Sequence, residues 1–199
     1  MTRIQTLALI AAVASGAGFI ATAAPAQDAG TVYVAQIGDS NRATVRQAAG
    51  SRGSTANVTQ NGDRNITRID QTSAGQSALV TQNGQGNEAT IAQEGTARGE
   101  VELAQTGTGN IASVNQASQV LANVAALRQT GEGNVIALDQ LGGNNAATLT
   151  QDGDANQMRV IQTGDNNALT WTQVGNGLSQ PTVVMPGGST MTITQTGGQ

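Results

Sequence analysis

The side chains that could do repeated chemistry in this sequence are the carboxamides of glutamine and asparagine. A carboxamide has two N–H donors and an oxygen acceptor, so identical amides placed one above another can donate and accept along a stack. The glutamines that recur in phase are Gln36, Gln47, Gln60, Gln71, Gln82, Gln93, Gln105, Gln116, Gln129, Gln140, Gln151, Gln162, Gln173 and, after a gap, Gln195. The asparagines in phase with them are Asn41, Asn65, Asn87, Asn110, Asn134 and Asn156.

The elements that would position these amides are short strands joined by a tight turn. The segment 76–93 (QSALVTQNGQGNEATIAQ) has two alternating runs around the turn NGQGN, which is the pattern of a strand, a turn and a second strand. Each full unit has Gly two residues and Asn five residues after its first glutamine. The turn glycines are Gly38, Gly62, Gly84, Gly107, Gly131 and Gly153. We expect them to adopt positive φ, a region that Asn tolerates best among the other residues.

The spacing of the glutamines distinguishes turns of constant length within units from loops of variable length between units. Within each unit the two glutamines are always 11 residues apart, whereas extra residues occur only between units. Inward positions of both runs are apolar, Thr67 being the one exception, and no charged residue enters them. Burial of one face explains this sorting. The sequence therefore predicts an all-β fold, a β-solenoid of stacked strand–turn–strand repeats. Its two parallel sheets would face each other as in amyloid cross-β, with rungs about 4.8 Å apart.

Composition argues against several other functions. The chain has 199 residues with no His or Cys and a formal net charge of −4, so it lacks the basic patch expected of a nucleic-acid-binding protein. Without His, Cys or Lys, no catalytic residues, metal ligands or cofactor-binding residues are predicted, and we expect no enzyme activity. The segment 152–156 (DGDAN) resembles the start of a calcium loop, but Gln157 and Thr163 stand where that loop needs Gly and Glu.

Residues 1–26 read as a secretory signal peptide. Arg3 supplies a positive start, residues 7–20 form an apolar run, and the small residues 24–26 predict cleavage after Ala26. The mature chain, 27–199, would then be one solenoid with no membrane span. Six full repeats occupy about 30–166, and a degenerate seventh and a partial eighth occupy about 167–199.

The units also resemble a known repeat. Residues 82–93 (QNGQGNEATIAQ) and 105–116 (QTGTGNIASVNQ) fit the curlin pattern Q-x-G-x-G-N-x-A-x-x-x-Q, and the resemblance extends over about 30–173. It implies a subunit of curli, the extracellular functional amyloid of bacterial biofilms. Implied partners are further copies of the chain in a head-to-tail homopolymer, a nucleator or major curli subunit, an outer-membrane secretion pore and periplasmic accessory proteins. The implied location is a secreted fibre attached to the bacterial cell surface, acting in adhesion, colonisation and matrix cohesion.

Other interpretations remain open. The units around Asp39, Asp63 and Asp154 lack the second turn glycine, which resembles slower-assembling repeats or a minor nucleator subunit. The threonines 148/150, 170/172 and 190/192/194 would face outward, as in an ice- or surface-binding solenoid, but earlier units carry Arg, Glu or Ala in those columns. Solvated turn carboxylates could act as gatekeepers against premature aggregation. Trp171 is predicted to point inward.

Overall fold

The computed structural model describes residues 8–14, 20–23, 30–48, 50–95 and 97–197. The regular elements of these residues are strands: β1 (Ala8–Ala14), β2 (Ile20–Ala23), β3 (Thr31–Ile37), β4 (Arg42–Gln47), β5 (Thr55–Asp63), β6 (Ile66–Gln71), β7 (Ser77–Gln85), β8 (Glu88–Gly95), β9 (Gly99–Thr108), β10 (Ile111–Ser118), β11 (Asn123–Glu132), β12 (Val135–Leu141), β13 (Ala146–Asp152), β14 (Gln157–Thr163), β15 (Ala168–Gly175), β16 (Val183–Met185) and β17 (Thr190–Gly197). Within the described ranges, we find no helix suited to crossing a membrane.

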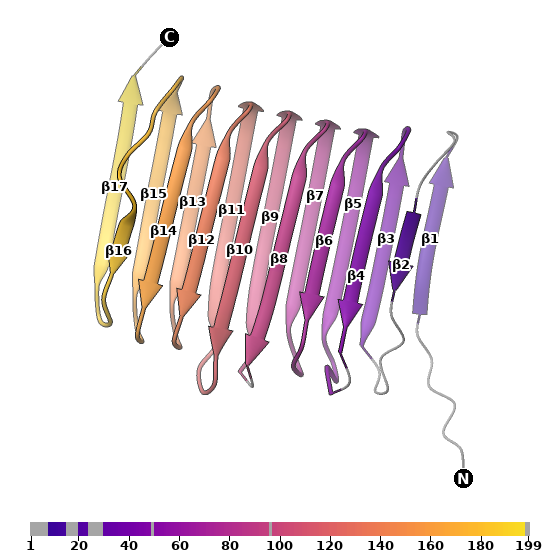
Figure 1. Cartoon of the computed structure of the whole chain (residues 1–199), viewed down its shortest axis with the longest axis horizontal. Coiled ribbons are helices and arrows are strands. Elements are labelled where there is room, and N and C mark those ends of the chain that lie inside the picture. Colours follow the sequence, from indigo (N-terminus) through magenta and orange to yellow (C-terminus); the bar gives the residue numbers. More distant parts are fainter. Residues whose placement is uncertain (1–7, 15–19, 24–29, 49, 96, 198–199) are drawn as a thin grey trace.

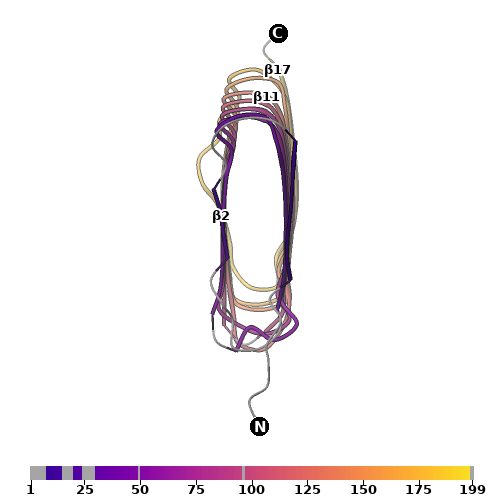
Figure 2. The same ribbon diagram turned by 90° about the vertical axis from the view of Figure 1, so that its right-hand side faces the viewer.

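The strands form two sheets that face each other. Sheet A contains the nine odd-numbered strands in sequence order, and sheet B contains the eight even-numbered strands (Figure 1). Every paired neighbour is parallel, because the chain crosses to the other sheet after each strand and returns one rung further along. Seen along the stack, each rung is a flattened loop with two long sides (Figure 2). The predicted β-solenoid with two parallel sheets is confirmed.

Pairing places equivalent residues of successive units directly beside each other. In sheet A, Gln60 pairs with Gln82 and Gln82 with Gln105; in sheet B, Gln71 pairs with Gln93. A one-residue slip would turn every apolar side chain outward, so the buried face fixes this register. Loops of different length between units leave the register unchanged, because they lie outside the paired segments.

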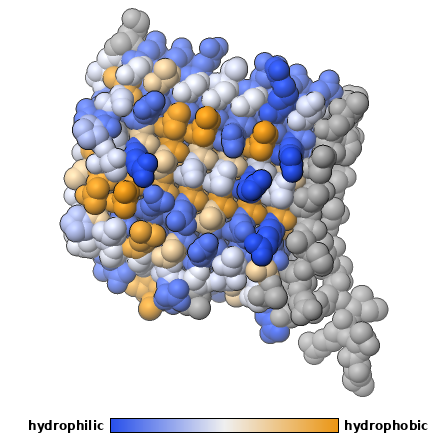
Figure 3. Space-filling model, viewed as in Figure 1, coloured by the Kyte–Doolittle hydropathy of each residue, from blue (hydrophilic) through white to orange (hydrophobic). Residues whose placement is uncertain are grey.

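The core consists of the inward columns of both sheets. Among the described residues it runs from Val32 to Met185 and consists of Ala, Val, Ile, Leu and Met with Trp171, all nearly inaccessible. In some strands a small inward side chain is followed by a larger one, as at Ala78 and Val80 in β7, whereas β12 has two large ones, Ile136 and Leu138. The outward face of sheet B, turned toward the viewer in Figure 3, instead mixes charged residues with scattered apolar ones such as Ile66 and Ile111.

The N-terminal end differs from the sequence-based expectation, which placed the first rung at Val32–Val34. Here β1 pairs in parallel with β3, and β2 pairs with β4, so two strands from the predicted leader form a preceding rung. The predicted cleavage site at Ala26 lies outside the described residues. The leader and the domain boundaries therefore remain predictions.

At the C-terminal end the repeat is irregular, as its sequence suggested. β16 has three residues, and an isolated bridge between Gln157 and Ser179 holds the loop before it against β14. Leu178 takes the place of a turn asparagine, and its main-chain N–H donates to Asn156 Oδ1 at 2.9 Å. β17 then resumes the regular pattern beside β15.

Candidate functional site: the stacked amide columns

All the glutamines and asparagines predicted from Gln36 to Gln173 are buried, and most are completely inaccessible. In sheet A their side chains form one continuous hydrogen-bonded column. Each Nε2 donates to the Oε1 of the next unit, from Gln36 to Gln60 at 2.6 Å and onward to Gln195, with later distances between 2.8 and 3.0 Å. All donors of this column point toward the C-terminal end.

Sheet B carries a second column with the same direction. It begins at Gln47, whose Nε2 donates to Gln71 Oε1 at 2.9 Å, and continues through Gln93, Gln116 and Gln140 to Gln162. There it stops, because Gln162 Nε2 meets Met185 Sδ at 3.8 Å. A thioether sulfur is a weak acceptor and has no donor to offer.

The second N–H of most column glutamines ties the two sheets together. Gln82 Nε2 in sheet A donates to the carbonyl oxygen of Ile66 in sheet B at 3.1 Å, and Gln71 Nε2 in sheet B donates to the carbonyl of Thr55 in sheet A at 3.0 Å. The same bond recurs in later units. Each of these glutamines therefore donates one N–H along the stack and the other across the core. This avoids the cost of about 1–3 kcal/mol for an unpaired buried polar group.

The turn asparagines form a column with the opposite direction. Asn87 Nδ2 donates back to Asn65 Oδ1 at 3.1 Å and also to the carbonyl of Gly107 on the following unit at 3.0 Å. Its own Oδ1 accepts from the main chain and side chain of Asn110. A single turn asparagine therefore bonds to the units on both sides of it.

The six turn glycines all have positive φ, between 102° and 120°. A Cβ at Gly62, Gly84 or Gly107 would overlap the carbonyl oxygen of the equivalent glycine in the next unit. The sequence indicated only the need for positive φ. Stacking adds a second requirement, because there is no room for a Cβ against the next unit. The other left-handed position lies one residue before the asparagine, at Ser40, Arg64 and Ala155 where glycine is missing, rather than at the asparagine itself.

A fourth column of stacked amides was not recognised from the sequence. Asn123, Asn145 and Asn167 lie at the opposite ends of the rungs, and Asn167 Nδ2 donates to Asn145 Oδ1 at 2.9 Å. The main-chain N–H groups of Asn145 and Asn167 also donate to the preceding Oδ1 atoms, each at 3.0 Å. The recurrence of Asn six residues before Gln129, Gln151 and Gln173 is the signal that could have revealed it.

Two residues that differ from the repeat pattern form hydrogen bonds with the glutamine column of sheet A. Thr67, the one polar residue at an inward aliphatic position, is buried; it accepts from Gln60 Nε2 at 3.2 Å and its Oγ1 bonds to Gln82 Oε1 at 2.9 Å. Trp171 points inward as predicted, and its Nε1 donates to Gln195 Oε1 at 3.0 Å. Both side chains therefore satisfy their polar groups on the glutamine column.

Some turn carboxylates have a structural contact beyond the solvation expected from the sequence. Asp63 Oδ1 accepts the main-chain N–H of Asp39, and Asp154 Oδ1 accepts that of Glu132, each at 2.8 Å. Asn176 accepts from Asp154 in the same way. These side chains bridge successive turns, so the short polar residue at this position has a role in stacking.

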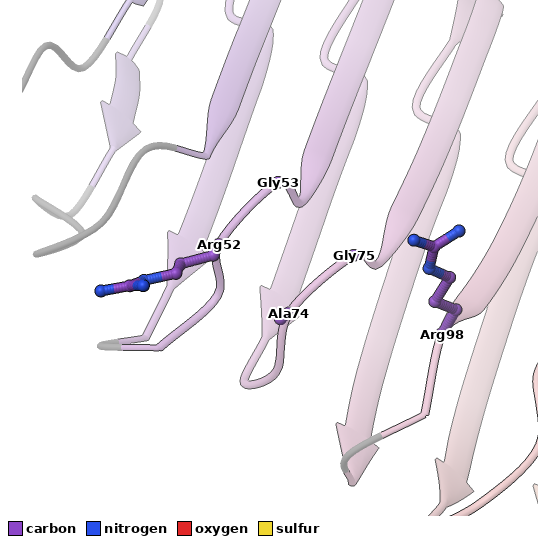
Figure 4. Close-up of a pocket in the computed structure, with 5 residues that line it drawn as sticks. All are labelled: Arg52, Gly53, Ala74, Gly75 and Arg98. Carbon is purple, nitrogen blue, oxygen red and sulfur yellow. The ribbon is translucent and has the colours of Figure 1, made fainter.

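A shallow pocket at the edge of the stack does not form a convergent site. It has a volume of about 470 Å³ and is lined by Arg52, Gly53, Ala74, Gly75 and Arg98. The two arginine side chains point in different directions from separate loops (Figure 4). The amide columns are therefore the stronger candidate for the functional feature, and their chemistry is cohesion between identical units.

The family model described as the curlin associated repeat matches residues 122–153 and 142–175. Residues 122–175 are therefore similar to the curlin associated repeat. The two matches begin just before β11 and end with β15, and within them lie Gln129, Asn134, Gln140, Gln151 and Asn156. A comparison with curated proteins found no match. The matched residues belong to the same stack of strands as the rest of the solenoid.

Proposed function

We propose that the chain is a structural subunit of a secreted curli-type amyloid fibre that self-assembles on the bacterial cell surface, for biofilm matrix, adhesion and colonisation. The observation that carries the proposal is the continuity of the amide columns. The sheet A column passes through every rung from Gln36 to Gln195, with donors facing one end and acceptors the other. A buried amide column of this kind is extended at little cost by another copy, because the added amides are the same.

The partners and the cellular location follow from the same proposal. Export would use the predicted leader, residues 1–26, followed by an outer-membrane pore with periplasmic accessory proteins. Further copies of the chain and a nucleator or major curli subunit would then be the partners at the cell surface. No nucleic acid, cofactor or metal has a part in this function.

The role of a minor nucleator subunit is a second candidate. It is favoured by the positive φ of Ser40 (58°), Arg64 (58°) and Ala155 (54°), a conformation that costs residues other than glycine about 1–2 kcal/mol. Such strain would slow a unit that must assemble unaided. Rapid assembly without seeds would favour the major subunit, whereas strong cross-seeding of another curli subunit at trace amounts would favour the nucleator.

The deciding experiment follows assembly of the purified, processed chain by thioflavin fluorescence, seeding and X-ray fibre diffraction. We expect self-seeding fibres with reflections near 4.8 Å and about 10 Å. Gln82→Ala or Asn110→Ala should slow fibre formation, because each breaks a buried column. Glu88→Ala is the control, since Glu88 is exposed on the outer face of β8, and it should leave assembly unchanged or faster.

A stable monomer that neither forms fibres nor seeds them would refute the proposal. The ice- or surface-binding alternative would then gain support, and ice-recrystallisation assays would test it. The threonines 148, 170 and 192 are aligned across β13, β15 and β17, as are 150, 172 and 194, but β11 presents Ala126 and Arg128 in those two columns.

A further inference from the structure

At the C-terminal end of the described stack, sheet A extends one strand further along the stack axis than sheet B. β17 pairs with β15 and extends sheet A, whereas β16 is the last described strand of sheet B (Figure 1). β16 pairs with β14 through Val183–Met185 only. The last described strand of sheet A therefore lies one strand beyond the last described strand of sheet B.

β16 is poorly suited to receive another strand. Met185 occupies the glutamine column and pairs with Gln162, so the column offers no amide donor to the next strand. Pro181 and Pro186 flank the strand and lack the N–H groups that a neighbouring strand would need. Proline beside a short strand is a common way to block an exposed sheet edge.

β17, in contrast, keeps the column intact. Its register with β15 is regular from Thr190 to Gly197, and Gln195 Oε1 accepts from Gln173 Nε2 at 2.8 Å. The donors of this column all point onward, so Gln195 presents its Nε2 beyond β17. The residue that begins the same column at the other end is Gln36, whose Nε2 donates to Gln60 Oε1.

Neither column receives an amide donor at its N-terminal end among the described residues. β1 pairs with β3 and places Val13 opposite Gln36. In sheet B, Gln47 Oε1 is buried without a hydrogen-bond partner. The leader strand β1 therefore occupies the edge of β3 without supplying the missing amide.

We propose that copies join through sheet A alone, with β17 of one copy paired in parallel with β3 of the next and Gln195 donating to Gln36. The inference rests on the proposed fibre function and requires that β1 leave β3, as removal of residues 1–26 would achieve. Sheet B is then interrupted at every junction, because β16 of one copy and β4 of the next lie two strand spacings, or about 9.6 Å, apart.

Engineered cysteines test this arrangement, because the natural sequence has none. Ala35 and Thr194 belong to the same outward column of sheet A and would be neighbours across a junction. Arg46 and Val184 are the equivalent pair in one outward column of sheet B. Within one copy, each pair lies at opposite ends of the stack. A disulfide needs Cα atoms no more than about 7 Å apart, which only adjacent strands satisfy.

The experiment compares fibres of the processed chain carrying A35C with T194C against fibres carrying R46C with V184C. The fibres are oxidised mildly, dissolved and run on non-reducing gels. The sheet A pair should give disulfide-linked multimers, whereas the sheet B pair should give monomers only. Each single-cysteine variant measures disulfides formed between laterally associated fibres. Seeded elongation gives a second measurement: Gln195→Val should slow it, whereas Met185→Gln should leave it unchanged.

Two results would overturn the junction while leaving the fibre intact. One is efficient cross-linking of the sheet B pair, and the other is monomer only from the sheet A pair in well-formed fibres. If the cysteine variants do not assemble, the elongation assay decides. Slower elongation by Met185→Gln together with normal elongation by Gln195→Val would also overturn the sheet A junction. An unmodified chain that forms no fibres at all would instead refute the proposed function, and with it this inference.

Discussion

At the scale of single residues, the two glycines of a turn have different reasons to be glycine. Gly84 has positive φ and lies against the carbonyl of Gly107, whereas Gly86 has positive φ with open space around its Cα. Gly86→Ala should therefore lower the free energy of unfolding by about 1 kcal/mol, the cost of left-handed backbone. Gly84→Ala should lower it considerably more, because it also forces neighbouring rungs apart. Denaturant titration of the two variants checks the order, and equal losses would contradict it.

In the turns that lack a second glycine, the opposite substitution, from another residue to glycine, can be made. Ala155 adopts φ 54° where Gly133 of the preceding unit adopts 62°. Ala155→Gly should stabilise the fold by about 1 kcal/mol, since glycine adopts this conformation without steric cost. The matched control, Gly133→Ala, should destabilise by a similar amount. Melting temperatures of both variants test this, and a loss of stability in Ala155→Gly would show that the strain assigned to this turn is absent.

At the scale of elements, turns and loops should respond differently to insertions. The turn between β7 and β8 holds Gly84 and Asn87 in stacked columns, whereas the loop around Val120 is exposed and already longer than most. An extra glycine after Gln85 would displace Asn87 from its bonds to both neighbouring units. The same glycine after Val120 should be tolerated.

Assembly rate and resistance to denaturant measure this difference. We expect the turn insertion to slow assembly strongly and the loop insertion to change it little. If the loop insertion proved as harmful as the turn insertion, the distinction drawn from the constant spacing of 11 residues within units would fail.

The same distinction explains how much of the fold could be predicted from the sequence. Apolar alternation and regular glutamines predicted the strands, their facing sheets and the inward position of Trp171. The bonds across the core, such as Gln82 to Ile66, depend on how far apart the sheets stand, which a repeat pattern does not specify. β16 was missed because three residues between prolines show no periodicity. The contact between Thr67 and Gln60 likewise arises only when the two sheets meet.

At the scale of the whole molecule, stability should be shared among nearly equivalent rungs. Residues 77–99 hold β7, β8, the loop after them and the first residue of β9. Their removal would leave β5 beside β9 in sheet A, with the same inward columns. In a repeat protein, stability is approximately a sum over units and their interfaces. The shortened chain should therefore still assemble and accept seeds from the parent fibres, with unchanged strand spacing.

Deletion of residues 77–87 is the matched control. It removes one strand and one turn, so β8 would follow β6 in the position of a sheet A strand and the asparagine column would lose a member. We expect this variant to assemble poorly. Fibre diffraction and cross-seeding compare the two deletions, and similar behaviour of both would argue against a stack with two distinct sheets.

The opposed directions of the amide columns have an electrical consequence. The two glutamine columns point their Oε1 atoms toward the N-terminal end, whereas the asparagine column at the turns points its Oδ1 atoms toward the C-terminal end. From β11 onward the additional asparagines 123, 145 and 167 form a second opposing column. Side-chain dipoles of opposite sense partly cancel in each rung, so the dipole moment contributed by these amides grows less with length than either set alone would produce.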